Sequence, residues 1–67
     1  MDIKKKLGTK VKHLRTKKGW SQEKLALTAG LDRTYIPSIE AGKRNVSITV
    51  IEKIANALNI EIIELLK

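Results

Sequence analysis

Hydrophobic positions recur at helical spacing along most of this chain. An amphipathic helix is predicted from about Asp2 to Lys18, because apolar side chains recur there every three or four positions, at Ile3, Leu7, Val11 and Leu14. A second series predicts a helix that begins after Ser47, with an inward face of Ile48, Ile51, Ile54, Ala55 and Leu58. The alternation that strands require is absent. The pattern therefore predicts an all-α fold.

Capping residues mark the ends of the shorter helices. Ser21 is the expected N-cap of a second helix, and Gly30 is expected to end that helix in the left-handed conformation. Asp32 is expected to cap a third helix, in which Arg33 and Thr34 are the first helical residues. These signals predict two short helices joined by a tight turn.

The C-terminal third of the chain adds two more elements. Residues 41–45 form a predicted loop, and Asn59 is expected to end the fourth helix in the left-handed conformation. A fifth helix is predicted over about residues 61–66. With no internal repeat or linker, the pattern predicts a single compact five-helix domain over residues 1–67.

Composition favours a polyanionic partner and argues against metal chemistry. The chain has no cysteine and one histidine, so neither a disulfide nor a zinc site is predicted, and no cofactor is implied. The net charge is +7, and residues 1–20 hold eight Lys/Arg against one acid. Nucleic acid is the favoured partner, because cations that neutralise phosphates release counterions. Lysines that only maintain solubility are the open alternative.

The sequence argues against membrane insertion and against catalysis. The first apolar run is broken by the lysines at 4–6, and no stretch approaches the roughly 18 apolar residues of a membrane span. A cytoplasmic protein is expected. No nucleophile–base pair, metal cluster or glycine-rich phosphate loop is present. We therefore predict that this protein is not an enzyme, and no small-molecule ligand is implied.

The segment from Ser21 to Glu40 carries the strongest functional signal. Ala26 is small where two helices must approach closely, and the second helix opens with polar side chains. A bihelical unit of this kind can place a helix N-terminus against DNA base edges. We interpret residues 21–40 as a helix-turn-helix.

From Leu7 to Leu66 the chain resembles the lambda-repressor-like (Cro/repressor, XRE) helix-turn-helix family. The similar pieces are Leu14-Arg15, Ser21-Gln22-Glu23, Leu25-Ala26, Tyr35-Ile36, Ile39-Glu40, Gly42-Lys43, Ile54-Ala55, Ala57-Leu58 and Glu64-Leu65-Leu66. The residues from Leu31 to Ile36, with Arg44-Asn45, are more narrowly similar to the controller proteins of restriction–modification systems. The resemblance implies a sequence-specific, homodimeric transcriptional regulator that binds a palindrome-like operator in double-stranded DNA. A phage-type repressor or an antitoxin-like protein-interaction module is the alternative.

Candidate DNA contacts surround the predicted third helix. Arg33 would donate two hydrogen bonds to guanine in the major groove, and Thr34 would offer its hydroxyl or methyl group to a base. The alternatives are a solvated arginine and a threonine that bonds locally. For Tyr35 the alternative is packing on the loop, and for Lys17 it is simple exposure to solvent. The full set of candidate contacts is Lys17, Gln22, Arg33, Thr34, Tyr35, Ser38, Lys43, Arg44 and Asn45.

Two internal features are also expected. The resemblance implies an internal ion pair between Arg15 and Glu40. Pro37 departs from the family pattern. Counted from Asp32 it would be the fifth helical residue and would remove the hydrogen bond to the Arg33 carbonyl.

The predicted fifth helix is apolar on more than one side. Its four aliphatic residues cannot all point inward from so short a helix, so an association face of Ile62, Ile63 and Leu66 is expected. A twofold dimer would present two recognition helices to successive major grooves, about 34 Å apart. The alternative is that these residues only seal a small core.

Overall fold

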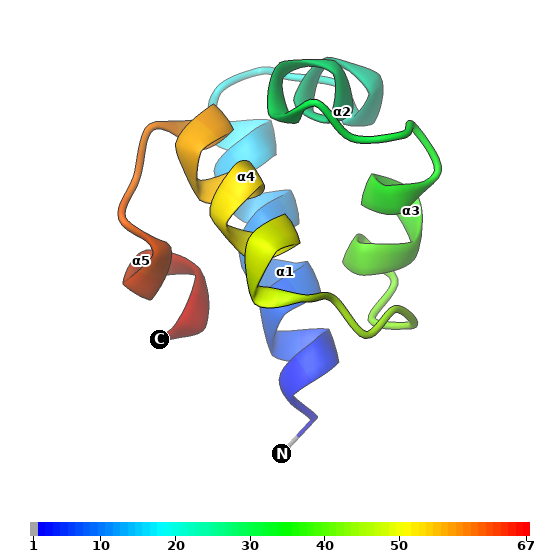
Figure 1. The fold of residues 1–67 in the computed structure, drawn as a ribbon, viewed down its shortest axis with the longest axis vertical. Coiled ribbons are helices and arrows are strands. Elements are labelled where there is room, and N and C mark those ends of the chain that lie inside the picture. The colour runs from blue at the N-terminus through cyan, green and yellow to red at the C-terminus, as the bar shows by residue number, and fades with distance from the viewer. Residues whose placement is uncertain (1) are drawn as a thin grey trace.

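The computed structural model describes residues 2–67, and this part of the chain holds five helices and no strand. They are α1 (Ile3–Lys17), α2 (Gln22–Ala29), α3 (Tyr35–Glu40), α4 (Ile48–Leu58) and α5 (Ile62–Leu66). In Figure 1, α1 and α4 occupy the centre, α3 and α5 lie on opposite sides, and α2 closes one end. None of these helices is long and apolar enough to cross a membrane. The predicted all-α class is confirmed.

The helix ends form at the capping residues that the sequence indicated. The hydroxyl groups of Ser21 and Ser47 each accept a hydrogen bond from the backbone N–H three residues further on, at 3.0 and 3.2 Å. Asp2 caps α1 through its carboxylate. Gly30 (φ 70°) and Asn59 (φ 58°) end α2 and α4 in the left-handed conformation.

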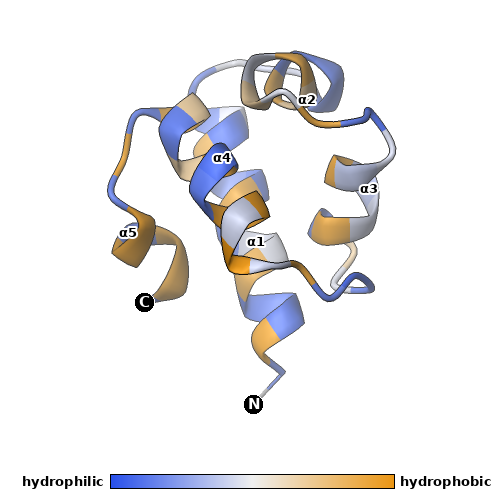
Figure 2. Cartoon of the chain, in the orientation of Figure 1, coloured by the Kyte–Doolittle hydropathy of each residue, from blue (hydrophilic) through white to orange (hydrophobic). Residues whose placement is uncertain are grey.

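The core is aliphatic and collects side chains from all five helices. Its buried members are Leu7, Val11, Leu25, Ala26, Ile36, Ile39, Ile51, Ile54, Ala55, Leu58 and Leu65. Gly8 lets α1 approach α3 closely, because a Cβ atom at this position would collide with the carbonyl oxygen of Ile39. Figure 2 shows that α5 is largely hydrophobic, although Leu65 is its only buried residue.

The inward faces of α1 and α4 are shorter than predicted. Ile3 and Ile48 were expected to point inward, but their side chains are 57% and 64% exposed. Both residues lie at the first position of their helices. Periodicity alone therefore placed them wrongly.

The third helix begins later than predicted. α3 starts at Tyr35 with Thr34 as its N-cap, so Arg33 and Thr34 lie in the preceding turn and not in the first helical turn. The cause is local. One carboxylate oxygen of Asp32 accepts hydrogen bonds from the Thr34 N–H at 2.9 Å and from the Thr34 hydroxyl at 2.7 Å. Asp32 thus makes the capping hydrogen bond that the sequence predicted. The Tyr35 N–H donates to the Asp32 carbonyl at 3.0 Å, so the chain forms a tight i→i+3 turn before the α-helix begins.

Pro37 is consequently the third residue of α3, not the fifth. The N–H groups of a first helical turn have no partner within the helix, so a proline there removes no helical hydrogen bond. The predicted loss of a bond to the Arg33 carbonyl is wrong, because Arg33 lies outside the helix.

Candidate nucleic-acid interface

The turn that precedes α3 presents two polar side chains on the surface. Arg33 and Thr34 are both exposed, and Arg33 makes no side-chain hydrogen bond or ion pair to any residue in the range 2–67. The hydroxyl of Thr34 is engaged locally, by Asp32. The side-chain and backbone hydrogen bonds from Thr34 hold the pKa of Asp32 below its ordinary value. Asp32 is therefore ionised at neutral pH, and its charge fixes the turn from which Arg33 projects.

Three of the candidate contacts form one cluster on α3. The guanidinium of Arg44 lies 4.3 Å from the centroid of the Tyr35 ring, and its Nε donates a hydrogen bond to the Ser38 hydroxyl at 2.8 Å. Ser38 in turn donates to a backbone carbonyl at the start of α3, that of Tyr35 at 3.0 Å or that of the N-cap residue Thr34 at 3.2 Å. Tyr35 is half-buried against the loop, which is the alternative that the sequence left open. Sequence spacing gave no indication of the Arg44 contact.

Glu40, at the end of α3, joins three helices. Arg15 Nε and Nη2 donate to the two carboxylate oxygens of Glu40 at 2.6 and 2.9 Å, and Gln22 Nε2 donates to the second oxygen at 3.0 Å. Arg15 Nη1 also donates to the Trp20 carbonyl at 2.6 Å. The hydrogen bond to Glu40 raises the pKa of Arg15, so the guanidinium keeps its charge in this junction. The expected Arg15–Glu40 pair is confirmed. Glu40 also holds the side chain of Gln22, the first residue of α2.

The remaining candidates, Lys17, Lys43 and Asn45, are exposed side chains near the ends of α1 and α3. None of the three makes a side-chain hydrogen bond or ion pair within the described range. Lys5, which sequence reasoning did not select, packs beneath the same loop: a Cβ atom at Gly42 would lie 2.7 Å from its Cγ. No sequence signal would have identified Lys5, because its place depends on how α1 meets the loop.

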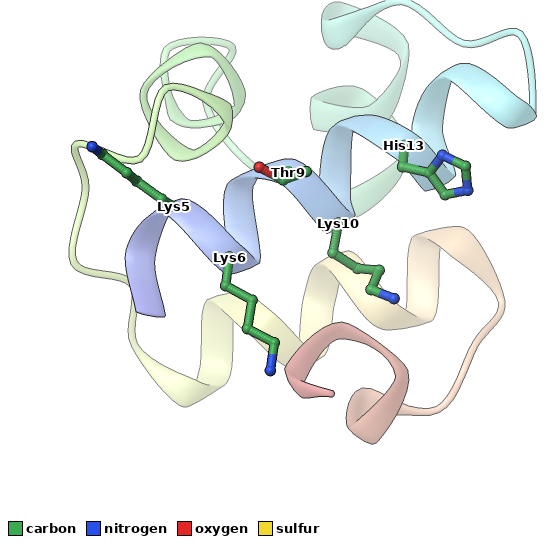
Figure 3. A pocket seen from close by; sticks show the side chains of 5 residues that line it. All are labelled: Lys5, Lys6, Thr9, Lys10 and His13. Carbon is green, nitrogen blue, oxygen red and sulfur yellow. The ribbon is translucent and has the colours of Figure 1, made fainter. Parts of the chain in front are cut away.

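The outer face of α1 is basic. Figure 3 shows side chains around a shallow hollow of about 560 Å³, namely Lys5, Lys6, Thr9, Lys10 and His13. Between residues 2 and 67 the ion pairs are Arg15–Glu40 and Lys67–Glu64, so the lysines of α1 are not neutralised there. This part of the chain also holds no group of side chains that could bind a metal ion. The outer face of α1 therefore carries lysines without an ion-pair partner in the described part of the chain, and the turn before α3 separately exposes Arg33. Both features suit a polyanion.

Residues 11–65 match the helix-turn-helix family HTH_3. The control protein C.MunI from Mycoplasma sp is 52% identical over 65 residues, which are 96% of this chain and 88% of that protein. A hypothetical transcription factor from Neisseria meningitidis is 42% identical over 97% of this chain, and the match spans 61% of its own length.

Solved structures are similar over most of the chain. The restriction-modification controller protein C.AhdI from Aeromonas hydrophila has a TM-score of 0.90 and 52% identity, over 92% of this chain and 94% of that one. C.Esp1396I bound to a 25 base pair operator site has a TM-score of 0.84 and 38% identity, over 91% of this chain and 80% of that one. The resemblance drawn from the sequence is thus confirmed. The chain belongs to the HTH_3 helix-turn-helix family of transcriptional regulators, and its relatives include restriction–modification controller proteins.

Proposed function

We propose that this protein is a restriction–modification controller protein that binds double-stranded DNA at a specific operator. The observation that carries the proposal is the likeness to C.Esp1396I, which has been solved on a 25 base pair operator site. The exposed turn before α3 supports it, because a duplex can reach Arg33 without displacing any internal contact of that side chain. In this proposal the single domain, residues 1–67, acts in the cytoplasm.

The position of each side chain determines whether we assign it to a base or to a phosphate. Arg33 would donate to guanine O6 and N7 in the major groove, a contact worth about 1–3 kcal/mol of discrimination. Thr34, whose hydroxyl is held by Asp32, would offer its methyl group to thymine. The N-terminus of α2 with Gln22, and the exposed side chains of Lys17, Lys43 and Asn45, would contact phosphates and so set the position of the protein.

A homodimer through α5 would supply the second half of the site. Ile63 is 56% exposed, and Ile62 and Leu66 are only partly buried. Burial of this apolar surface against a second copy would stabilise association. Twofold symmetry would then place two copies of α3 about 34 Å apart and would require a palindrome-like operator.

The test is selection of bound sites from random duplexes, followed by a salt titration of the recovered site and of a scrambled duplex. We expect a twofold-symmetric site, and we expect binding that weakens steeply with salt while the preference for that site persists. Recovery of no enriched sequence would refute the proposal, and a protein-interaction module would give this result.

A substitution pair tests the assignment of Arg33. Arg33→Ala should relax the preference at one base pair in each half-site and should lower operator affinity by about tenfold. Lys53→Ala is the matched control, because Lys53 is an exposed cation on α4. Equal effects of the two changes would show that Arg33 contributes charge only.

A further inference from the structure

The side chain of Arg44 folds back onto α3. Arg44 follows the end of the helix by four residues, yet its guanidinium covers the ring of Tyr35, the first residue of α3. The hydrogen bonds from Thr34 do most to lower the pKa of Asp32, and the nearby positive charge of Arg44 adds to that effect. The guanidinium therefore lies beside the N-terminal end of α3, the part that would enter a groove.

The Ser38 hydroxyl is already engaged by the protein. A serine hydroxyl has one proton to donate, and here that proton goes to the backbone carbonyl of Tyr35 or Thr34. The same oxygen accepts the Arg44 Nε–H at 2.8 Å. The terminal amino groups of Arg44, in contrast, have no hydrogen-bond partner among the described residues. Donors that can reach a duplex are thus on Arg44, whereas the Ser38 proton is already used.

We propose that Ser38 is a positioning residue: with the Tyr35 ring as a platform, it fixes the Arg44 guanidinium beside α3, and Arg44 makes the contact to the duplex. This inference rests on the proposed function, and it replaces the expectation that Ser38 itself touches DNA. The physical reason is preorganisation. An arginine that is already immobilised loses less side-chain entropy when it binds.

Nuclear magnetic resonance of the arginine Nε–H groups tests the first half of the proposal. The chain has three arginines, so Arg15 in its buried ion pair is a rigid reference and exposed Arg33 is a mobile one. In the free protein we expect an Arg44 order parameter close to that of Arg15. In Ser38→Ala it should fall toward that of Arg33, and Ser38→Thr, which keeps the hydroxyl, should restore it. An Arg44 group as mobile as Arg33 in the unsubstituted protein would overturn the proposal.

A double-mutant cycle on the selected operator tests the second half. Ser38→Ala should weaken binding about two- to tenfold, with little change in the salt slope, because the charge of Arg44 remains. Arg44→Ala should weaken binding more, and Ser38→Ala should add nothing in that background. Additive losses would show that Ser38 contacts DNA directly and would overturn the inference.

The two proposals fail in different ways. If the unsubstituted protein prefers no duplex sequence, the proposed function fails. If it binds its operator and the cycle is additive, only the role of Ser38 fails. Alanine is a better helix former than serine, so loss of α3 is not expected in Ser38→Ala. An unchanged far-ultraviolet circular dichroism spectrum checks this point.

Discussion

Removal of the Glu40 carboxylate would test how strongly the junction of α1, α2 and α3 stabilises this domain. The side chains of Arg15 and Glu40 are 10% and 4% exposed, and their shortest N–O distance is 2.6 Å. Glu40→Ala leaves the Arg15 guanidinium buried without its anion. It also removes the acceptor of the Gln22 amide.

The expected loss is a large share of the total stability. Removal of one partner of a buried ion pair costs about 3–5 kcal/mol, because the remaining charge keeps its desolvation penalty. In Glu40→Ala, Arg15 still donates to the Trp20 carbonyl, and a small part of its side chain is exposed to water. We therefore expect the free energy of unfolding to fall by an amount near the lower limit, about 3 kcal/mol. A domain of this length has a free energy of unfolding of about 3–10 kcal/mol. Much of the Glu40→Ala protein should therefore be unfolded at mild urea concentrations.

Urea unfolding followed by Trp20 fluorescence and circular dichroism measures this loss. Glu64→Ala is the matched control, since its ion pair with Lys67 joins side chains that are 48% and 60% exposed. An exposed pair of this kind contributes about 0–1 kcal/mol. If Glu40→Ala lowers the free energy of unfolding by less than about 1 kcal/mol, or by no more than the control does, the junction is not a major source of stability.

Three further outcomes are expected. Ile63→Glu should give a monomer in sedimentation. Leu27→Glu is the control, at an 80% exposed position on α2, and should leave the dimer intact. A dimer that persists in Ile63→Glu would exclude α5 as the interface. Gly8→Ala should lower the free energy of unfolding by about 1–3 kcal/mol, because the new methyl group meets the backbone of α3, and an unchanged urea midpoint would contradict this. The folded-state pKa of Asp32 is lowered, so its stabilising contribution is present above the ordinary aspartate range, about pH 4, and is lost as pH falls through the folded value. Thr34→Val should raise the pKa of Asp32 toward its ordinary value in a carbon-13 titration, and no change would exclude the Thr34 hydroxyl as the cause.

The features that could be predicted from sequence were those with local causes. Ser21 and Ser47 cap helices through backbone donors three residues away, and Gly30 and Asn59 take the left-handed conformation at helix ends. These interactions depend on a few consecutive residues, so the sequence contains them directly. The aliphatic spacing of α1 and α4 likewise identified most of the core.

The features that sequence could not provide depend on competition or on tertiary approach. Asp32 makes a capping hydrogen bond, but spacing cannot decide whether the residues after it begin an α-helix or a tight i→i+3 turn. The position of Arg44 over Tyr35 requires the loop to turn back on the helix. The contact between Lys5 and Gly42 requires α1 to pass beneath that loop. The residues of the candidate site were therefore identified more reliably than their individual roles.

Arg33 stands outside both helices of its motif, on a turn whose shape is set by the side chains of its neighbours. Exchange of this one side chain would thus leave folding almost untouched. Related chains could diverge in target preference at position 33 without a compensating change in the core, so recognition and stability would evolve as separate traits.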